Sequence, residues 1–112
     1  MNYKIIKATK KNIDQVAKLF DLYRQFYKYK SNIQESTNYI SERINNNEST
    51  IFLALTENNN PAGFVQLYET FGSLQLGKII ILYDLYVTEE CRKHGIGEKL
   101  IKISQEYAES IS

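Results

Sequence analysis

Six consecutive residues of this chain have side chains and spacing suited to binding an anion. They are Arg92, Lys93, His94, Gly95, Ile96 and Gly97. An apolar run that predicts a β-strand (78–87) precedes them, and an amphipathic segment that predicts a helix (98–111) follows. The first N–H groups of a helix have no partner within it, and the helix dipole favours negative charge there. Glycine has no Cβ, so a phosphate can approach its backbone. The segment therefore predicts a phosphate-binding turn.

The elements that position this turn follow from the spacing of apolar residues. Helical periodicity predicts a helix over 10–28, with Thr9 as its N-cap, and a weaker helix over 35–44. Strands are predicted over 3–8, 50–56, 64–70 and 78–88. The last three are joined by short connections with turn residues, which is typical of an antiparallel meander. The order βααβββα predicts an α+β fold with helices packed on a mostly antiparallel sheet.

Length and composition exclude several classes of protein. The 112 residues are enough for one domain, and the net charge of +1 gives no field that would recruit nucleic acid. No apolar run approaches the roughly 18 residues of a membrane-spanning helix. One cysteine rules out an internal disulfide and leaves too few ligands for zinc, so we expect no metal. The N-terminus lacks a signal-peptide core, and we expect a cytoplasmic protein.

Two familiar glycine-rich loops do not fit this turn. The dinucleotide-binding fingerprint GxGxxG needs a third glycine, whereas Gly97 is followed by Glu98, Lys99 and Leu100. It also needs an acidic residue about 20 positions further on, and the sequence ends first. The phosphate loop of nucleotide triphosphatases, GxxxxGK(S/T), is absent from the sequence.

The pattern Arg-x-x-Gly-x-Gly after a strand resembles the acetyl-CoA signature of the GNAT N-acetyltransferases, (Gln/Arg)-x-x-Gly-x-(Gly/Ala). The surroundings of the motif strengthen the resemblance. A meander ends in Asp84-Leu85-Tyr86-Val87-Thr88-Glu89-Glu90, and a predicted helix follows the loop directly. Two helices precede the meander, as in the family. The resemblance covers essentially all 112 residues and implies a single GNAT acetyltransferase domain over 1–112.

The resemblance implies that acetyl-CoA is a co-substrate and that particular backbone groups bind it. In the family, the loop amides hold the pyrophosphate of coenzyme A, and they correspond here to Lys93, His94, Gly95, Ile96, Gly97 and Glu98. The preceding strand, here Leu85, Tyr86 and Val87, carries a bulge in the family. It pairs with the pantetheine arm as with another strand. The side chains of Arg92, Lys93 and His94 either contact phosphate or form a solvated basic cluster.

Acetyl transfer to an amine requires a group that accepts the proton of the ammonium and a donor to the developing oxyanion. The family typically uses a backbone N–H for the oxyanion, which corresponds to Leu85 or a neighbour. Asp84 is the only acid in the Ile79–Val87 run and is the candidate base or ammonium anchor. It could equally accept a hydrogen bond from an N–H or a tyrosine within the sheet. Glu69 is a distant second candidate.

Two further groups of residues are ambiguous. Arg24, Phe26, Tyr27 and Tyr29 lie near the end of the first predicted helix, where family members often form the wall of the acceptor site. They are either part of that wall or ordinary core and rim residues. Cys91 lies beside a helix start, which can lower the pKa of a thiol. The family transfers acetyl directly, so we expect Cys91 to have no role in the reaction.

The sequence departs from the family at its C-terminal end. A family domain continues with a further strand, a helix and usually two more strands, and that helix commonly supplies a tyrosine that protonates the thiolate. Without them, the 78–88 strand is left as an apolar edge, which predicts a homodimer or larger oligomer through this edge. Activity could be weak or lost in a domain shortened in this way.

Two functions remain open on these grounds. The first is an N-acetyltransferase that moves acetyl from acetyl-CoA to a primary amine of a small molecule or peptide. The alternative is a non-catalytic coenzyme A-binding module that acts through oligomerisation. Neither requires a metal, nucleic acid or membrane.

Overall fold

One antiparallel sheet with the strand order β1-β2-β3-β4 forms the centre of the computed structural model, which describes residues 1–111. Its strands are β1 (Tyr3–Lys7), β2 (Thr50–Thr56), β3 (Pro61–Gly72) and β4 (Gly77–Val87). The helices are α1 (Ile13–Phe26), α2 (Ile33–Asn45) and α3 (Ile96–Ile111). The predicted α+β order βααβββα is therefore confirmed.

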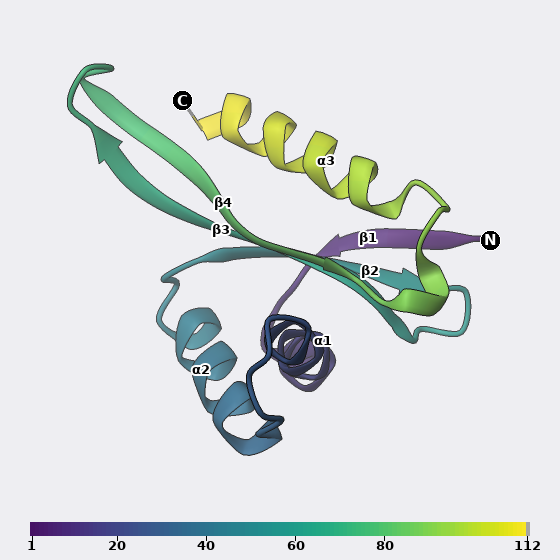
Figure 1. Cartoon of the computed structure of the whole chain (residues 1–112). Helices are drawn as coiled ribbons and strands as arrows, with labels where there is room; N and C mark the ends of the chain where they lie inside the picture. The colour runs from purple at the N-terminus through teal and green to yellow at the C-terminus, as the bar shows by residue number, and fades with distance from the viewer. Residues whose placement is uncertain (112) are drawn as a thin grey trace.

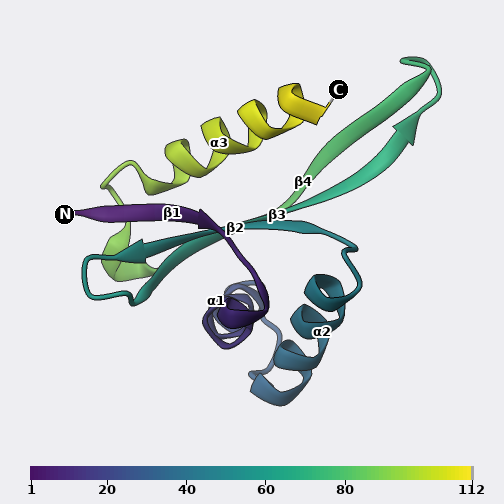
Figure 2. The ribbon, with the colours of Figure 1, turned by 180° about the vertical axis from the view of Figure 1, so that it is seen from behind.

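The helices cover both faces of the sheet. The helices α1 and α2 lie together on one face, and α3 lies alone on the other (Figures 1 and 2). Each interface has its own apolar core. Val16, Leu19, Ile40, Leu53 and Phe64 belong to the α1/α2 side, and Ala54, Val65, Leu67, Ile96 and Leu100 belong to the α3 side. Because strand residues alternate between faces, β2 and β3 contribute side chains to both cores.

The structure shifts several predicted boundaries. A 3-10 turn over Lys10–Asn12 precedes α1, and Thr9 caps this turn through its side chain. The helix predicted from Glu98 begins at Ile96, so the last two residues of the anion-binding motif lie in its first turn. Pro61 is the first residue of β3, which is a strand position where a missing N–H is tolerated.

The β3–β4 hairpin extends beyond the rest of the sheet (Figure 1). Pairing between β2 and β3 ends at Thr50 and Leu67, whereas β3 and β4 stay paired as far as Gly72 and Gly77. The projecting arm carries apolar side chains that are almost fully exposed at its tip, including Leu74 at 96% and Leu76 at 92%. In the described sheet, β4 is an outer strand along its whole length. Within residues 1–111, no helix is both long and apolar enough to cross a membrane.

Candidate functional site

The connection between β4 and α3 has a backbone conformation that requires glycine at one position. Gly95 has φ of +80°, in the region that side chains disfavour, and Lys93 also has a positive φ of 69°. A Cβ at Gly95 would meet nothing within 4 Å. The glycine is therefore needed for the backbone angle and not because neighbouring atoms crowd it.

This conformation leaves a series of N–H groups without an acceptor. Lys99 N–H donates to the Gly95 carbonyl at 3.1 Å, which is the first hydrogen bond of α3. In the described part of the chain, the structure contains no hydrogen bond donated by the backbone N–H groups of 93–98. A hollow of about 300 Å³ adjoins them, lined by Val87, Cys91, Arg92, Lys93, Gly95, Ile96, Gly97 and Glu98. The structure thus brings most of the predicted loop residues around one anion-sized space at a helix N-terminus.

The side chains of the loop differ in what they contact. The Nε of Arg92 donates to the Val87 carbonyl at 2.9 Å, and its guanidinium lies over the rings of Phe26 and Tyr86. Arg92 therefore ties the loop to β4 and to the end of α1. Lys93 and His94 are exposed. Cys91 is buried and packs with Ile96 and Leu100, so its position is explained by packing.

The end of β4 is regular where the resemblance implied a bulge. Residues 84–87 pair in continuous register with β3, with Leu85 opposite Val65 and Val87 opposite Gly63. The bulge lies just before, because Asp84 is opposite Gln66 while Leu82 is opposite Leu67, which leaves Tyr83 unpaired. The expectation of a bulge within Leu85–Val87 was thus wrong in position. An extra residue bends the strand and changes which face the following side chains occupy.

Asp84 lies on the α1/α2 face of the sheet and is 6% exposed. Its Oδ2 accepts a 2.8 Å hydrogen bond from Nε2 of Gln66 on β3. Burial raises the pKa of the Tyr23 phenol on α1, and hydrogen bonding to the nearby Asp84 carboxylate raises it further. Asp84 therefore has hydrogen-bond partners within the fold, as one of its two interpretations predicted. Such partners are compatible with the other interpretation, a role toward a substrate.

A second tyrosine adjoins the same carboxylate. Burial raises the pKa of Tyr68, with further contributions from its hydrogen bond to Tyr39 and from the charge of Asp84. The two hydroxyl oxygens of Tyr39 and Tyr68 lie 2.9 Å apart. Tyr23 and Tyr68 are therefore neutral hydroxyls at ordinary pH.

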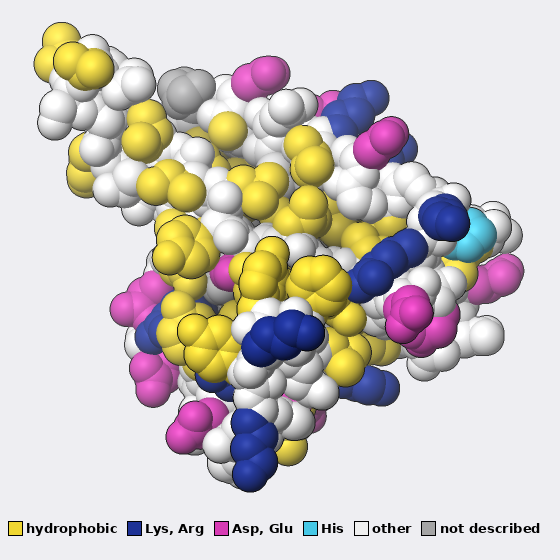
Figure 3. Space-filling model, viewed as in Figure 1, with side chains coloured by type: hydrophobic (Ala, Val, Ile, Leu, Met, Phe, Trp, Pro, Cys, Tyr) yellow, Lys and Arg dark blue, Asp and Glu magenta, His cyan; other side chains and the backbone are white. Residues whose placement is uncertain are grey.

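Aromatic side chains surround Asp84 and extend to the surface. Tyr83 stands edge-on to Tyr68 with ring centroids 5.5 Å apart, and Tyr23 packs against Tyr86 and Phe64. Phe26, Tyr27 and Tyr83 are each more than half exposed. On the side of the molecule seen in Figure 3, hydrophobic side chains gather across the middle. Of the four residues predicted as wall or rim, Phe26 and Tyr27 adjoin this aromatic surface, while Arg24 lies over the Tyr29 ring.

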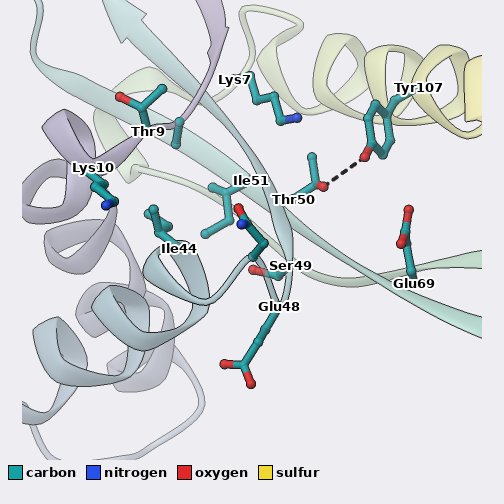
Figure 4. Close-up of a pocket in the computed structure, with 12 residues that line it drawn as sticks. Lys7, Thr9, Lys10, Ile44, Glu48, Ser49, Thr50, Ile51, Glu69 and Tyr107 are labelled. Atoms are coloured by element: carbon teal, nitrogen blue, oxygen red, sulfur yellow. Dashed lines mark hydrogen bonds between the residues drawn. The ribbon is translucent and has the colours of Figure 1, made fainter.

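A cavity larger than the hollow beside the loop lies elsewhere in the described structure. It measures about 500 Å³ and opens at the start of β2, with Lys7, Ser49, Thr50, Glu69 and Tyr107 among its lining residues (Figure 4). Glu69 lies 3.8 Å from the Lys78 ammonium and belongs to this cavity. The structure therefore does not bring Glu69 to Asp84. Among residues 1–111, no cluster of three or more potential metal ligands was found.

Sequence reasoning did not identify three residues that contact or adjoin Asp84, namely Tyr23, Gln66 and Tyr68. The only sequence signal for Gln66 is its polar side chain within the apolar run Ala62–Leu67, which is the same anomaly that marked Asp84. The two polar residues in adjacent predicted strands could have been matched to each other. Tyr23 lay within a helical apolar face and looked like an ordinary core residue.

Comparison with known proteins agrees with this geometry. Residues 16–111 match the acetyltransferase (GNAT) family. An N-acetyltransferase of Bacillus subtilis (strain 168), described as uncharacterised, is 40% identical over 93 residues, covering 83% of this chain and 62% of that protein. A probable acetyltransferase of Haemophilus influenzae is 34% identical over 104 residues, covering 93% of this chain and 71% of that protein. This chain thus spans less than two thirds of the length of the first relative.

Solved structures show the same fold. The crystal structure of a probable acetyltransferase superposes with a TM-score of 0.89 at 36% identity, covering 96% of this chain and 72% of the other. The antiparallel sheet and the helices that cover it accordingly form a known architecture. By sequence and by structure, this chain belongs to the GNAT family of acetyltransferases.

Proposed function

We propose that this chain carries out acetyl-CoA-dependent N-acetylation of a primary amine on a small molecule or peptide. One observation carries the proposal. The free N–H groups at the start of α3 adjoin the end of β4, the same strand that presents Asp84 on the opposite face of the sheet. A phosphate-bearing donor and an amine acceptor would therefore meet at one strand.

The donor side would use backbone groups. The amides of Lys93 to Glu98 would hold the pyrophosphate of coenzyme A, since they are unpaired and lie where the helix dipole favours an anion. The outer edge of β4 at Leu85, Tyr86 and Val87 would pair with the pantetheine arm. A backbone N–H at Leu85 or a neighbour would face the carbonyl oxygen as negative charge develops there.

The acceptor side would use Asp84. Its carboxylate would hold the incoming ammonium and take its proton, directly or through water. The amine nitrogen then forms a bond to the acetyl carbon, and the carbon–sulfur bond breaks. The products are the amide and the thiol, with the thiolate taking up one proton. The aromatic side chains around Asp84 exclude water and provide apolar contact for the body of the acceptor.

The proposed reaction is tested by measuring thiol release from acetyl-CoA in the presence of a panel of primary amines. Turnover that requires both acetyl-CoA and an amine supports the proposal. Calorimetric binding of coenzyme A without turnover favours the alternative, a non-catalytic coenzyme A-binding module that acts through oligomerisation. If coenzyme A does not bind at all, both proposals fail. We place the reaction in the cytoplasm, where Cys91 would remain a free thiol.

A further inference from the structure

Gln66 is a polar residue at the centre of the sheet with no exposed surface. It lies on β3 between Val65 and Leu67, two apolar residues that face α3. Burying a side-chain amide costs free energy unless its donors and acceptor are paired. The position therefore calls for partners, and the structure supplies them on both sides of the amide.

The two partners fix the orientation of the Gln66 side chain. Ser49 Oγ donates to Gln66 Oε1 at 2.7 Å, and Gln66 Nε2 donates to Asp84 Oδ2 at 2.8 Å. An ionised carboxylate only accepts hydrogen bonds, so the amide nitrogen must face Asp84 and the amide oxygen must face Ser49. The hydroxyl, the amide and the carboxylate thus form one directed chain that runs from Ser49, just before β2, through Gln66 on β3 to Asp84 on β4.

The bulge at Tyr83 is what allows this chain to form. Gln66 is opposite Asp84 and Leu67 is opposite Leu82, so β4 contains one extra residue at this level. Side chains alternate between the faces of a strand, and a shift of one residue exchanges the faces. Without the extra residue, Asp84 could not lie on the same face of the sheet as Gln66.

We propose that Gln66, oriented by Ser49, is a positioning residue that holds the Asp84 carboxylate in one rotamer so that its second oxygen faces the acceptor amine. The inference rests on the proposed function. A neutral donor suits this task because an arginine or lysine would place a second positive charge beside the ammonium. A base held at a fixed orientation also loses less conformational freedom when the substrate binds.

The groups around Asp84 are consistent with this arrangement. Tyr23 faces it from α1, Tyr68 faces it from β3, and Tyr83 precedes it on β4. Both Tyr23 and Tyr68 have a raised pKa, so they act as neutral hydroxyls at ordinary pH. Gln66 donates a 2.8 Å side-chain hydrogen bond to the carboxylate from within the sheet.

The test compares turnover of full-length variants with acetyl-CoA and a reactive amine. Gln66→Met keeps the length of the side chain and removes its donor. We expect kcat to fall by at least about fivefold, because the carboxylate is no longer held in place. The KM for acetyl-CoA should stay unchanged, since the loop before α3 is untouched. Thr50→Val is the matched control, because it breaks the Thr50–Tyr107 hydrogen bond, which does not involve Asp84.

A double-mutant cycle distinguishes positioning from a general loss of stability. In an Asp84→Asn background, Gln66→Met should cause little further loss of kcat, because its effect acts through Asp84. An equal fold-loss in both backgrounds overturns the inference. If Asp84→Asn alone leaves turnover intact, the proposed role of Asp84 fails. If Asp84→Asn impairs turnover but Gln66→Met does not, only the positioning role fails.

Ser49 provides a second route if Gln66→Met does not fold. Ser49→Ala should lower kcat in the same direction by a smaller factor, and Ser49→Thr, which keeps the hydroxyl, should restore it. A fall with Ser49→Thr equal to that with Ser49→Ala overturns the inference. The side-chain amide resonances of Gln66 give a readout that needs no turnover. They should shift when butylamine is added to the wild-type protein and stay unchanged in Asp84→Asn, and a lack of response in the wild type also counts against the inference.

Discussion

The Gly95 carbonyl accepts the hydrogen bond of Lys99 N–H, so three N–H groups between them point out of the first turn of α3. These belong to Ile96, Gly97 and Glu98. The positive φ of Gly95 sets the direction in which the chain enters the helix. The loop and the helix start therefore act as one backbone unit, and two of its residues are glycines with different roles.

The first prediction separates these two glycines. Gly95→Ala should destabilise the fold by about 1 kcal/mol, because alanine is strained at positive φ. Gly97→Ala should stabilise it by up to about 1 kcal/mol, because Gly97 lies in α3 and a Cβ there would approach only Val87 Cγ2 at 3.9 Å. Both variants should weaken coenzyme A binding at least about tenfold in calorimetry, a loss of about 1.4 kcal/mol.

Gly77→Ala is the control for this pair, because it lies at the far end of β4 and has ample space for a Cβ. Its affinity for coenzyme A should match the wild type. Unchanged affinity in both Gly95→Ala and Gly97→Ala would show that the loop does not hold the pyrophosphate.

The second prediction concerns Asp84. Asp84→Asn preserves the shape of the side chain and an oxygen that can accept from Gln66, so the fold should survive. Turnover should fall by about 100-fold or more, in the range for the loss of a general base. Affinity for coenzyme A should stay within about twofold, a difference of about 0.4 kcal/mol. Glu90→Gln, an exposed acid near the same loop, is the control and should leave both quantities unchanged.

The third prediction concerns Asp21, a buried carboxylate that joins α1 to the start of α2. It accepts hydrogen bonds from Gln25, Ser31, Asn32 and Ser36. Asp21→Ala leaves these donors without their acceptor and should lower the free energy of unfolding by about 3 kcal/mol. Asp14→Ala, at an exposed position in α1, should change it by less than about 0.5 kcal/mol. Urea denaturation measures both, and equal effects would contradict this role.

Asp21 also predicts a pH dependence. Burial acts to raise its pKa, but the hydrogen bonds, with that from Ser31 first, outweigh burial and lower it below the ordinary value. Its contribution to stability is therefore complete above the ordinary carboxyl pKa of about 3.9 and is lost as pH falls through the lower folded value. The stability difference between wild type and Asp21→Ala should shrink below about pH 4.

The fourth prediction concerns the outer edge of β4. In the middle of β4, the side chains of Ile81 and Leu82 are about 40% exposed, and that of Tyr83 is 68% exposed. We propose that a second copy of the chain pairs with this edge, because an exposed apolar strand edge favours pairing with another chain. Light scattering at micromolar concentration should report a dimer or larger species. Leu82→Lys should shift it toward monomer, whereas Lys102→Glu on exposed α3 surface should not. A monomeric wild type contradicts the proposal.

Much of the fold could be predicted because its signals are local. Apolar spacing identified the α-helices and strands of the described residues, since each must present a side to one of the two cores, whereas the short 3-10 turns over Lys10–Asn12 and Glu89–Cys91 were not predicted. The anion-binding turn was also evident, because glycine, basic residues and the change from strand to helix all occur within 92–98. The helix start was displaced by two residues because Ile96 packs into the α3 core and begins the helix early.

The sequence by itself determined the family, the order of elements and the loop before α3. Only the tertiary structure decided what surrounds Asp84. Its partner Gln66 is 18 residues away in the sequence, and the bulge at Tyr83 places the two side chains on the same face. Tyr23 approaches Asp84 from α1, which is separated from β4 in the sequence by α2, β2 and β3. The physical reason is register. The face on which a strand residue lies depends on every residue that pairs before it, and a single extra residue reverses that face.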